Sequence, residues 1–305
     1  MRKKVAFVFP GQGSQTVGMG ADLYDAFPAV RALFAEADEA LGHPLSRIIR
    51  EGPEDLLRQT ANTQPAILLV SVAVYRALDL TPAVVAGHSL GEYSALVAAG
   101  ALRFRDAVAL VHKRGRYMQD AVPEGAGAML ALIGVEPEAV GAALGALGGP
   151  VDIANYNAPG QIVIAGLRDP TRAVAERCGA RQVVELAVSA PFHCRLMAPA
   201  EARLAADLDE VPFRDPAIPL YNNVDARKAT TAATVRDGLK RQVSRPVRWT
   251  ELVERMIAEE GVQTFVEVGP GNVLSGLIRR IDRTVERLQV HDCATVESAR
   301  AALGA

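Results

Sequence analysis

The chain is poor in cysteine. Its 305 residues include three, Cys178, Cys194 and Cys293, and none of them belongs to a C-x-x-C pair. An odd number of cysteines without such pairs argues against a disulfide framework and against a zinc site. We therefore expect buried or otherwise idle thiols.

The sequence also lacks long hydrophobic runs and carries little net charge. No segment approaches the roughly 18 uninterrupted apolar residues of a membrane span, and the first residues lead into a strand-like stretch without a cleavage site for a signal peptide. The formal net charge of −2 argues against bulk affinity for nucleic acid or for an anionic membrane. We therefore expect a cytoplasmic globular protein.

Half of the residues are hydrophobic, so the chain can bury a large core, as one domain or as two unequal ones. Residues 5–9 are apolar without alternation, as expected of a parallel strand covered on both faces. Helical and strand-like patterns alternate, which predicts an α/β fold with a parallel sheet. The expected helices are residues 28–41 and 65–78, and the other expected strands are residues 83–86, 218–221, 264–268 and 288–290.

The pattern changes between residues 125 and 189. Short strands and two helices follow one another there in the order β-α-β-β-α-β, which is the ferredoxin-like pattern. We expect residues 125–189 to form a small ferredoxin-like subdomain, inserted into a large α/β-hydrolase-like domain of residues 1–124 and 190–305. The expected strands are residues 128–134, 151–155, 161–165 and 182–186, and the expected helices are residues 138–147 and 170–178.

Ser89 is the first candidate for chemistry. Residues 87–91 read GHSLG, between the apolar run of residues 83–86 and a helix-forming stretch at residues 92–99. A strand, a sharp turn and a helix around G-x-S-x-G form a nucleophile elbow, which exposes the serine hydroxyl. The N–H of the next residue can then donate to a developing oxyanion.

A serine hydroxyl needs a base within hydrogen-bond reach, and histidine has the pKa that suits neutral pH. His193 lies at the junction that follows the small subdomain, where clefts form between domains. His291 lies near the C-terminus, where an α/β-hydrolase would place its base. We favour His193 and keep His291 as the alternative. The other three histidines are weaker candidates. His43 lies in a loop and His112 within a helix, and the side chain of His88 should diverge from that of Ser89.

Arg114 is unusual because it shares one helical face with apolar residues at spacings of three and four. Those apolar residues are Ala107, Leu110, Val111 and Met118. An unpaired buried charge costs several kcal/mol, so we expect an anionic partner, and a planar guanidinium suits a carboxylate. A structural salt bridge and a favourable charge at a helix C-terminus are the alternatives.

Gln12 lies between two glycines after the first strand. The pattern begins like a dinucleotide-binding loop, but Thr16 stands where G-x-G-x-x-G requires glycine, so the Rossmann interpretation fails. The glutamine lies at the sheet edge where α/β proteins bind ligands, and its amide could serve an oxyanion. A tight turn that satisfies its own backbone is the alternative.

Several short motifs follow one another along the chain. They are residues 9–15 (FPGQGSQ), 62–66 (NTQPA), 87–93 (GHSLGEY), 114–115 (RG), 189–193 (SAPFH) and 267–271 (EVGPG). In this order they resemble the malonyl-CoA:acyl carrier protein transacylases, an acyltransferase family of fatty acid and polyketide synthesis. The resemblance extends from residue 9 to residue 271 and also fits an inserted ferredoxin-like subdomain.

The resemblance implies a ping-pong reaction. Ser89 would attack malonyl-CoA to form a malonyl-serine ester, and His193 would take and return the proton. The main-chain carbonyl of Gln242 would orient the histidine, so that no catalytic aspartate is needed. The malonyl group would then pass to the phosphopantetheine thiol of acyl carrier protein, so the prosthetic group belongs to the partner and the chain needs no cofactor of its own. The sequence itself predicts no membrane or nucleic acid partner, and nothing in it demands more than a monomer.

The resemblance also assigns the groups that hold the substrate. Backbone N–H groups of Gln12 and Leu90 would form the oxyanion hole, and Arg114 would hold the free malonyl carboxylate. Phe192 resembles the phenylalanine of related polyketide acyltransferases that prefer malonyl over methylmalonyl groups, and a packing role is its alternative.

Three alternatives remain open from the sequence. The same site would serve a free-standing acyltransferase of a polyketide assembly line. A serine hydrolase or thioesterase would use Ser89 with His291, and a scaffold would use neither.

Acyl carrier proteins are acidic, so a basic docking surface is expected. Residues 227–287 hold 12 Lys and Arg against 8 Asp and Glu, which suggests such a surface, and it would raise the rate of encounter with the carrier protein.

Overall fold

The structure is a computed structural model that describes residues 3–304, and it contains two β-sheets. The larger sheet has six strands in the order β10-β9-β1-β2-β7-β8. Neighbouring strands are parallel except for β7 and β8, which are antiparallel. The predicted parallel sheet, including its three late strands, is thus confirmed, with a short antiparallel edge in addition. The strands are β1 (Val5–Phe9), β2 (Val84–Gly87), β7 (Leu220–Tyr221), β8 (Lys228–Ala229), β9 (Thr264–Val268) and β10 (Glu286–Val290).

Helices cover both faces of this sheet, as the apolar pattern of β1 predicts. Phe7 and Phe9 belong to one hydrophobic core, which they share with α2, α5 and α7. Ala6 and Val8 point to the opposite face, into a second core with α12 and α13. The helices around the sheet are α1 (Ala21–Ala26), α2 (Pro28–Leu41), α3 (Leu45–Glu51), α4 (Glu54–Arg58), α5 (Thr60–Leu78), α6 (Gly91–Ala98), α7 (Phe104–Asp120), the 3₁₀ turn η1 (Arg195–Met197), α10 (Ala198–Glu210), α11 (Ala232–Gln242), α12 (Trp249–Glu260), α13 (Val273–Ile281) and α14 (Cys293–Leu303).

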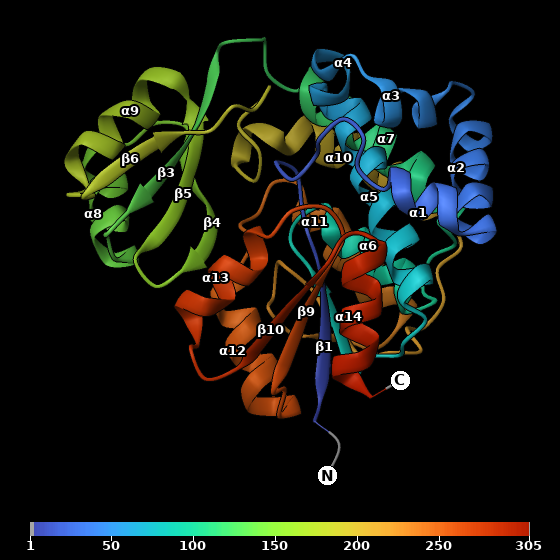
Figure 1. Cartoon of the computed structure of the whole chain (residues 1–305). Coiled ribbons are helices and arrows are strands. Elements are labelled where there is room, and N and C mark those ends of the chain that lie inside the picture. The colour runs from blue at the N-terminus through green and yellow to red at the C-terminus, as the bar shows by residue number, and fades with distance from the viewer. Residues whose placement is uncertain (1–2, 305) are drawn as a thin grey trace.

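The smaller sheet lies to one side of the molecule with its own two helices, coloured green to yellow in Figure 1. It is antiparallel, with the strand order β4-β5-β3-β6. The apolar residues on one of its faces form a third core with α8 and α9, whereas Met129, Ala131 and Val163 on the other face belong to the first core. The predicted β-α-β-β-α-β order is confirmed, whereas the boundaries at residues 125 and 189 stay a prediction. The elements are β3 (Gly127–Ile133), α8 (Pro137–Leu147), β4 (Val151–Ala158), β5 (Gln161–Leu167), α9 (Arg168–Arg177) and β6 (Gln182–Glu185).

One predicted helix start was wrong. The helix predicted for residues 65–78 begins at Thr60, so that Pro65 lies inside it. The side chains of its first turn anchor the earlier start: Thr63 Oγ1 donates to the carbonyl of Leu57 at 2.6 Å and Asn62 Nδ2 to that of Leu56 at 2.9 Å. These contacts with α4 outweigh the tendency of proline to end a helix.

The buried thiols match the prediction from the sequence. Cys178 and Cys194 are buried and free, and Cys293 is free and half-buried.

No helix within residues 3–304 is both long enough and apolar enough to cross a membrane.

The turn after β2 is held against β1. Phe9 and Gly87 are paired at the carboxyl ends of these two strands, and α6 starts directly after the turn. A Cβ on Gly91 would lie 2.0 Å from the carbonyl oxygen of Phe9. Glycine is therefore required there, and its absence of a side chain lets α6 pack on β1 and brings Ser89 to the sheet edge.

Candidate active site

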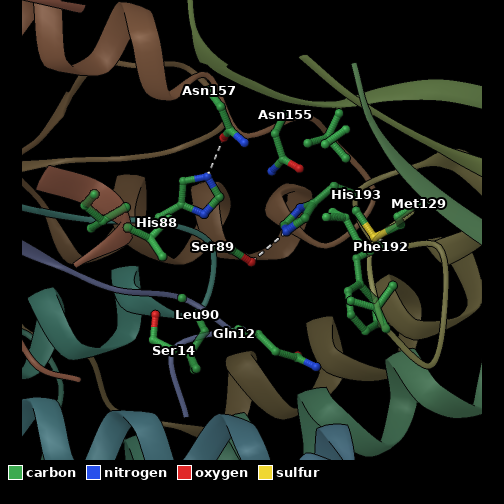
Figure 2. A pocket seen from close by; sticks show the side chains of 18 of the residues that line it. Gln12, Ser14, His88, Ser89, Leu90, Met129, Asn155, Asn157, Phe192 and His193 are labelled. Atoms are coloured by element: carbon green, nitrogen blue, oxygen red, sulfur yellow. Dashed lines mark hydrogen bonds between the residues drawn. The ribbon is translucent and has the colours of Figure 1, made fainter. Parts of the chain in front are cut away.

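Ser89 and His193 meet at the edge of the larger sheet. Ser89 Oγ lies 2.6 Å from His193 Nε2, although 104 positions separate the two residues. Figure 2 shows this contact in the centre of a pocket. Both residues have left-handed backbone conformations, with φ of 52° at Ser89 and 58° at His193. Such strain in residues other than glycine persists only where the surroundings enforce it, and it concentrates at functional sites.

Two backbone carbonyls fix the orientation of the His193 ring. Nδ1 lies 2.9 Å from the carbonyl oxygen of Gln242 and 3.2 Å from that of Arg245. Because a carbonyl only accepts, Nδ1 must carry the ring hydrogen, which leaves Nε2 as the acceptor for the Ser89 hydroxyl. Burial, and next the positive charge of Arg114, lower the pKa of His193 to about 3. The imidazole is therefore neutral at pH 7, and its unprotonated Nε2 faces the Ser89 hydroxyl.

The pair lines a cavity of about 300 Å³ between the two sheets. One wall comes from the larger part of the chain and includes Gln12 and Leu90, while the other comes from the smaller sheet and includes Met129 and Val163. Phe192, which is 6% exposed, closes the cavity beside Met129. An apolar cavity with a few converging polar groups is the usual form of a small-molecule site.

Gln12 and Leu90, which the resemblance assigns as oxyanion donors, both line the cavity with Ser89. Leu90 is the N-cap of α6, where backbone N–H groups have no partner within the helix. The side-chain amide of Gln12 donates to Thr60 Oγ1 at 3.2 Å. That side chain is thus engaged with α5, and the oxyanion role of the two backbone N–H groups stays a prediction.

Arg114 is brought to the nucleophile from α7 and is 1% exposed. Its Nη2 donates to Ser89 Oγ at 3.1 Å and to Gln242 Oε1 at 3.1 Å, and its Nη1 donates to Gln64 Oε1 at 2.8 Å. These acceptors are all neutral, and the buried Nε has no hydrogen-bond partner in the described part of the chain. Within residues 3–304 Arg114 forms no salt bridge, which argues against the alternative of a structural ion pair. A guanidinium that lines the cavity and has only neutral acceptors is suited to bind a carboxylate.

His88 and two asparagines complete the polar wall, and the sequence did not single out the asparagines. His88 Nε2 lies 2.9 Å from Asn157 Oδ1, and Asn155 lies next to His193 in the same cavity. Burial lowers the pKa of His88, so its ring is neutral. Two asparagines in alternate positions of β4 were the available signal, because polar residues two apart in a strand share a face.

His291 does not reach the nucleophile. It follows β10, its Nε2 lies 3.5 Å from Asp292 Oδ2, and its side chain is 42% exposed. It is not among the residues that line the cavity with Ser89. In residues 3–304, no group of three or more His, Cys, Asp or Glu side chains could hold a metal ion.

Comparisons with known sequences find relatives that match nearly the whole chain. A family described as "Acyl transferase domain" matches residues 6–301. A malonyl CoA-acyl carrier protein transacylase of Haemophilus influenzae is 48% identical over 303 residues, which cover 96% of this chain and 97% of that protein. The protein of the same name from Bacillus subtilis is 46% identical over 305 residues, which cover 97% of this chain and 96% of that protein.

Comparisons with solved structures give the same result. An acyl carrier protein S-malonyltransferase from Vibrio cholerae has a TM-score of 0.94 and 48% identity, covering 97% of this chain and 99% of that chain. A type II PKS acyl-carrier protein complex with its malonyl-transacylase gives a TM-score of 0.94 and 46% identity, covering 97% of this chain and 98% of that chain.

Proposed function

The chain belongs to the acyl transferase domain family, and from that we propose that it transfers malonyl groups from malonyl-CoA to the phosphopantetheine thiol of acyl carrier protein in fatty acid biosynthesis. The observation that carries the proposal is the Arg114 guanidinium, 3.1 Å from a Ser89 hydroxyl that is itself 2.6 Å from His193 Nε2. A nucleophile, a base and a cation for the acid end of the acyl group thus lie together.

In the first half-reaction, Ser89 Oγ attacks the thioester carbonyl of malonyl-CoA while its proton passes to His193 Nε2. The carbonyl oxygen becomes an oxyanion, which the backbone N–H groups of Gln12 and Leu90 stabilise. When the C–O double bond re-forms, the C–S bond breaks, and the CoA thiol leaves with the proton from His193. The product is a malonyl-serine ester.

In the second half-reaction, the phosphopantetheine thiol gives its proton to His193 and attacks the ester carbonyl. The Ser89 oxygen leaves and regains that proton, so the enzyme returns to its starting form. The chemistry needs no cofactor of the enzyme, because the prosthetic group belongs to the carrier. The carbonyl of Gln242 keeps Nδ1–H in place through both steps, in the role that a carboxylate has in other serine enzymes.

Arg114 binds the free carboxylate of the malonyl group, and Phe192 limits the space beside it. A ring in that wall leaves little room for an α-methyl group, which favours malonyl over methylmalonyl, although a pocket discriminates one methyl group by only about 1–3 kcal/mol. Phe192 is held on the wall by its contact from the backbone N–H to Met129 Sδ at 3.3 Å.

The proposal also covers the division of the chain into two domains and the cellular location of the protein. The strand order β4-β5-β3-β6 with α8 and α9 supports a ferredoxin-like subdomain of residues 125–189. The elbow after β2 supports an α/β-hydrolase-like larger domain of residues 1–124 and 190–305. A cytoplasmic location fits enzymes that act on CoA thioesters and carrier proteins.

The test is the mass of the intact protein after brief incubation with malonyl-CoA. We expect an added mass of about 86 Da, which is malonic acid less water, on the wild type and none on the Ser89→Ala variant. The His193→Ala variant should also fail to load, whereas the His291→Ala variant should load normally. Absence of the adduct on the wild type under mild conditions would refute the proposal.

A free-standing acyltransferase of polyketide synthesis is the second candidate, because one similar structure is a type II PKS carrier protein complex. Both functions use the same site. The rates of transfer to the fatty acid carrier and to polyketide carriers of the same cell distinguish them, and we expect the fatty acid carrier to be the faster acceptor.

A further inference from the structure

Glu92 is a buried carboxyl group that the proposed reaction does not use. It lies in the first turn of α6, three positions after Ser89, and is 1% exposed. Burial, opposed by hydrogen bonds from Asn223 and Gln242, raises the pKa of Glu92 to about 7. A carboxyl group in such a place costs folding free energy, so its contacts indicate what it contributes.

Two donors converge on one oxygen of Glu92. Oε2 accepts a hydrogen bond from Gln242 Nε2 at 2.8 Å and another from the backbone N–H of Asn223 at 3.0 Å. Asn223 in turn holds both sides of the elbow. Its Oδ1 accepts from the Ser89 N–H at 2.6 Å, and its Nδ2 donates to the carbonyl of Gly87 at 2.6 Å. The strained turn at Ser89 is thus fixed by a side chain whose own backbone is bonded to Glu92.

Gln242 connects Glu92 to the remaining parts of the site. Besides Glu92, its Nε2 donates to the Ser89 carbonyl at 3.0 Å, and its Oε1 accepts from Arg114 Nη2 at 3.1 Å. Its backbone carbonyl accepts from His193 Nδ1 at 2.9 Å. Because arginine can only donate, Oε1 must face Arg114 and the amide nitrogen must face Glu92. The amide therefore has one satisfied orientation, and Glu92 supplies an acceptor that this orientation needs.

We propose that Glu92 is a positioning residue. Through Gln242 and Asn223 it holds Ser89, His193 and Arg114 in their relative positions. Glu92 is not among the residues that line the cavity, and the inference rests on the proposed malonyl transfer. A carboxyl group presents an acceptor oxygen in either protonation state, so the role requires an acceptor at this distance and does not require a charge. That distinction makes the inference testable.

The test compares three variants at position 92 by single-turnover loading from saturating malonyl-CoA, measured per folded molecule. Glu92→Gln keeps an acceptor oxygen at the same reach, and we expect its loading rate to stay within about fivefold of wild type. Glu92→Leu fills the space without an acceptor, and we expect a loss of about 100-fold, as for reacting groups displaced by about 1 Å. Glu92→Asp keeps the charge but withdraws the oxygen by about one C–C bond, and we expect a loss of at least about tenfold.

Glu267→Gln is the matched control. Glu267 is also 1% exposed, and its oxygens accept from the backbone N–H groups of Leu274 and Ser275 without contact to Gln242. In this variant one acceptor oxygen becomes an NH2 group that faces a backbone N–H, so we expect lower stability but loading per folded molecule within about threefold of wild type.

The outcomes separate this inference from the proposed function. A wild type that does not load refutes malonyl transfer itself. A folded Glu92→Leu that loads at the wild-type rate, or a Glu92→Gln as slow as Glu92→Leu, overturns the positioning role while malonyl transfer stands. If Glu92→Leu does not fold, the contrast between Glu92→Gln and Glu92→Asp decides: a faster Asp variant overturns the inference, and a faster Gln variant supports it.

Discussion

Neutral oxygens surround the charged and basic side chains in the cavity. Arg114 donates to the amide oxygens of Gln64 and Gln242, and His193 donates to two backbone carbonyls. A carboxylate in contact with Arg114 would already occupy the place of an acidic substrate. Neutral acceptors orient the guanidinium and leave its positive charge available for the malonyl carboxylate that we propose it binds.

Replacing Arg114 should change the choice of substrate. We expect Arg114→Ala to lower kcat/KM for malonyl-CoA by about 10- to 150-fold, because hydrogen bonds to charged groups contribute about 1.5–3 kcal/mol. The rate with acetyl-CoA, which has no second carboxylate, should change little or rise. Arg116→Ala, an exposed residue on the same helix, is the control and should leave both rates unaltered. Equal loss with both thioesters from Arg114→Ala would show a structural role.

Glu92 should also make stability depend on pH. Its pKa is raised from 4.5 to about 7 in the folded state, so the folded protein keeps a proton that the unfolded chain releases. The associated stability is complete below pH 4.5 and is lost as the pH rises through 7. Relative to Glu92→Gln, the wild type should lose at most about 3 kcal/mol between pH 4.5 and pH 8.

Urea unfolding of both proteins at pH 5 and pH 8 measures this difference. His193, whose pKa is lowered to about 3, destabilises the folded state as the pH falls below 6.5, but both proteins share this contribution and the difference removes it. A gap between wild type and variant that is the same at both pH values would contradict the expectation.

The sequence indicated those site residues that have a local pattern. Ser89 stands in an elbow motif, Arg114 on an apolar helical face, and His193 at a junction, and the structure brings all three together. Glu92 stands in the motif of residues 87–93, but neither that motif nor the sequence around Asn223 indicates their contact, which joins positions 131 residues apart. The helical spacing predicted that Arg114 is buried, but the neutral character of its partners depends on three separate elements and could not be predicted.

At the scale of elements, the site depends on how closely α6 approaches β1. A Cβ on Gly91 would overlap the carbonyl of Phe9 at 2.0 Å, and that carbonyl belongs to a buried central strand. The strand and helix therefore cannot separate locally without moving Ser89. Element types were predicted well here because buried parallel strands and amphipathic helices have clear periods. The start of α5 was missed because it depends on contacts with α4.

A methyl group at Gly91 should therefore disrupt the elbow. We expect Gly91→Ala to lower the free energy of unfolding by at least about 3 kcal/mol and to abolish malonyl loading, since the backbone must shift to relieve the overlap. Gly141→Ala is the control: Gly141 is exposed within α8 and has open space around its Cβ position. That change should stabilise by about 0.5–1 kcal/mol. Thermal unfolding with parallel loading assays measures both, and a stable, active Gly91→Ala would contradict the packing argument.

At the scale of the whole molecule, the cavity lies between two sheets that both contribute residues to the first core, and the smaller sheet has a further core with α8 and α9. The nucleophile comes from one side, and the wall opposite comes from β3, β4 and β5 of the other. The two sheets and their approximate elements followed from the sequence. Their relative placement could not, because it depends on contacts between residues far apart in the chain, such as Asp152 of β4 and Arg195, 43 positions later.

The contact between Asp152 and Arg195 is a second link, besides that of Met129 with Phe192, from the smaller sheet to the segment of His193. Asp152 Oδ2 accepts from the backbone N–H of Arg195 at 2.8 Å, and its two oxygens also accept from the Arg195 guanidinium at 2.5–3.0 Å. Arg195 lies two residues after His193, whose backbone is strained at φ 58°. The side chain of Arg195 is 64% exposed, so the ion pair alone contributes little to stability.

Removing the contact of Asp152 with Arg195 should markedly slow malonyl loading and only slightly lower the free energy of unfolding. We expect Asp152→Ala to reduce the single-turnover loading rate by about tenfold or more, because it frees the backbone beside His193, while stability falls by no more than about 1–2 kcal/mol. Arg195→Ala keeps the bond from the backbone N–H to Asp152 and should lose less. Glu185→Ala, which removes exposed ion pairs within the smaller sheet's own elements, should load normally. Arg195→Ala as slow as Asp152→Ala would show that the guanidinium, and not the backbone bond, holds His193 in place.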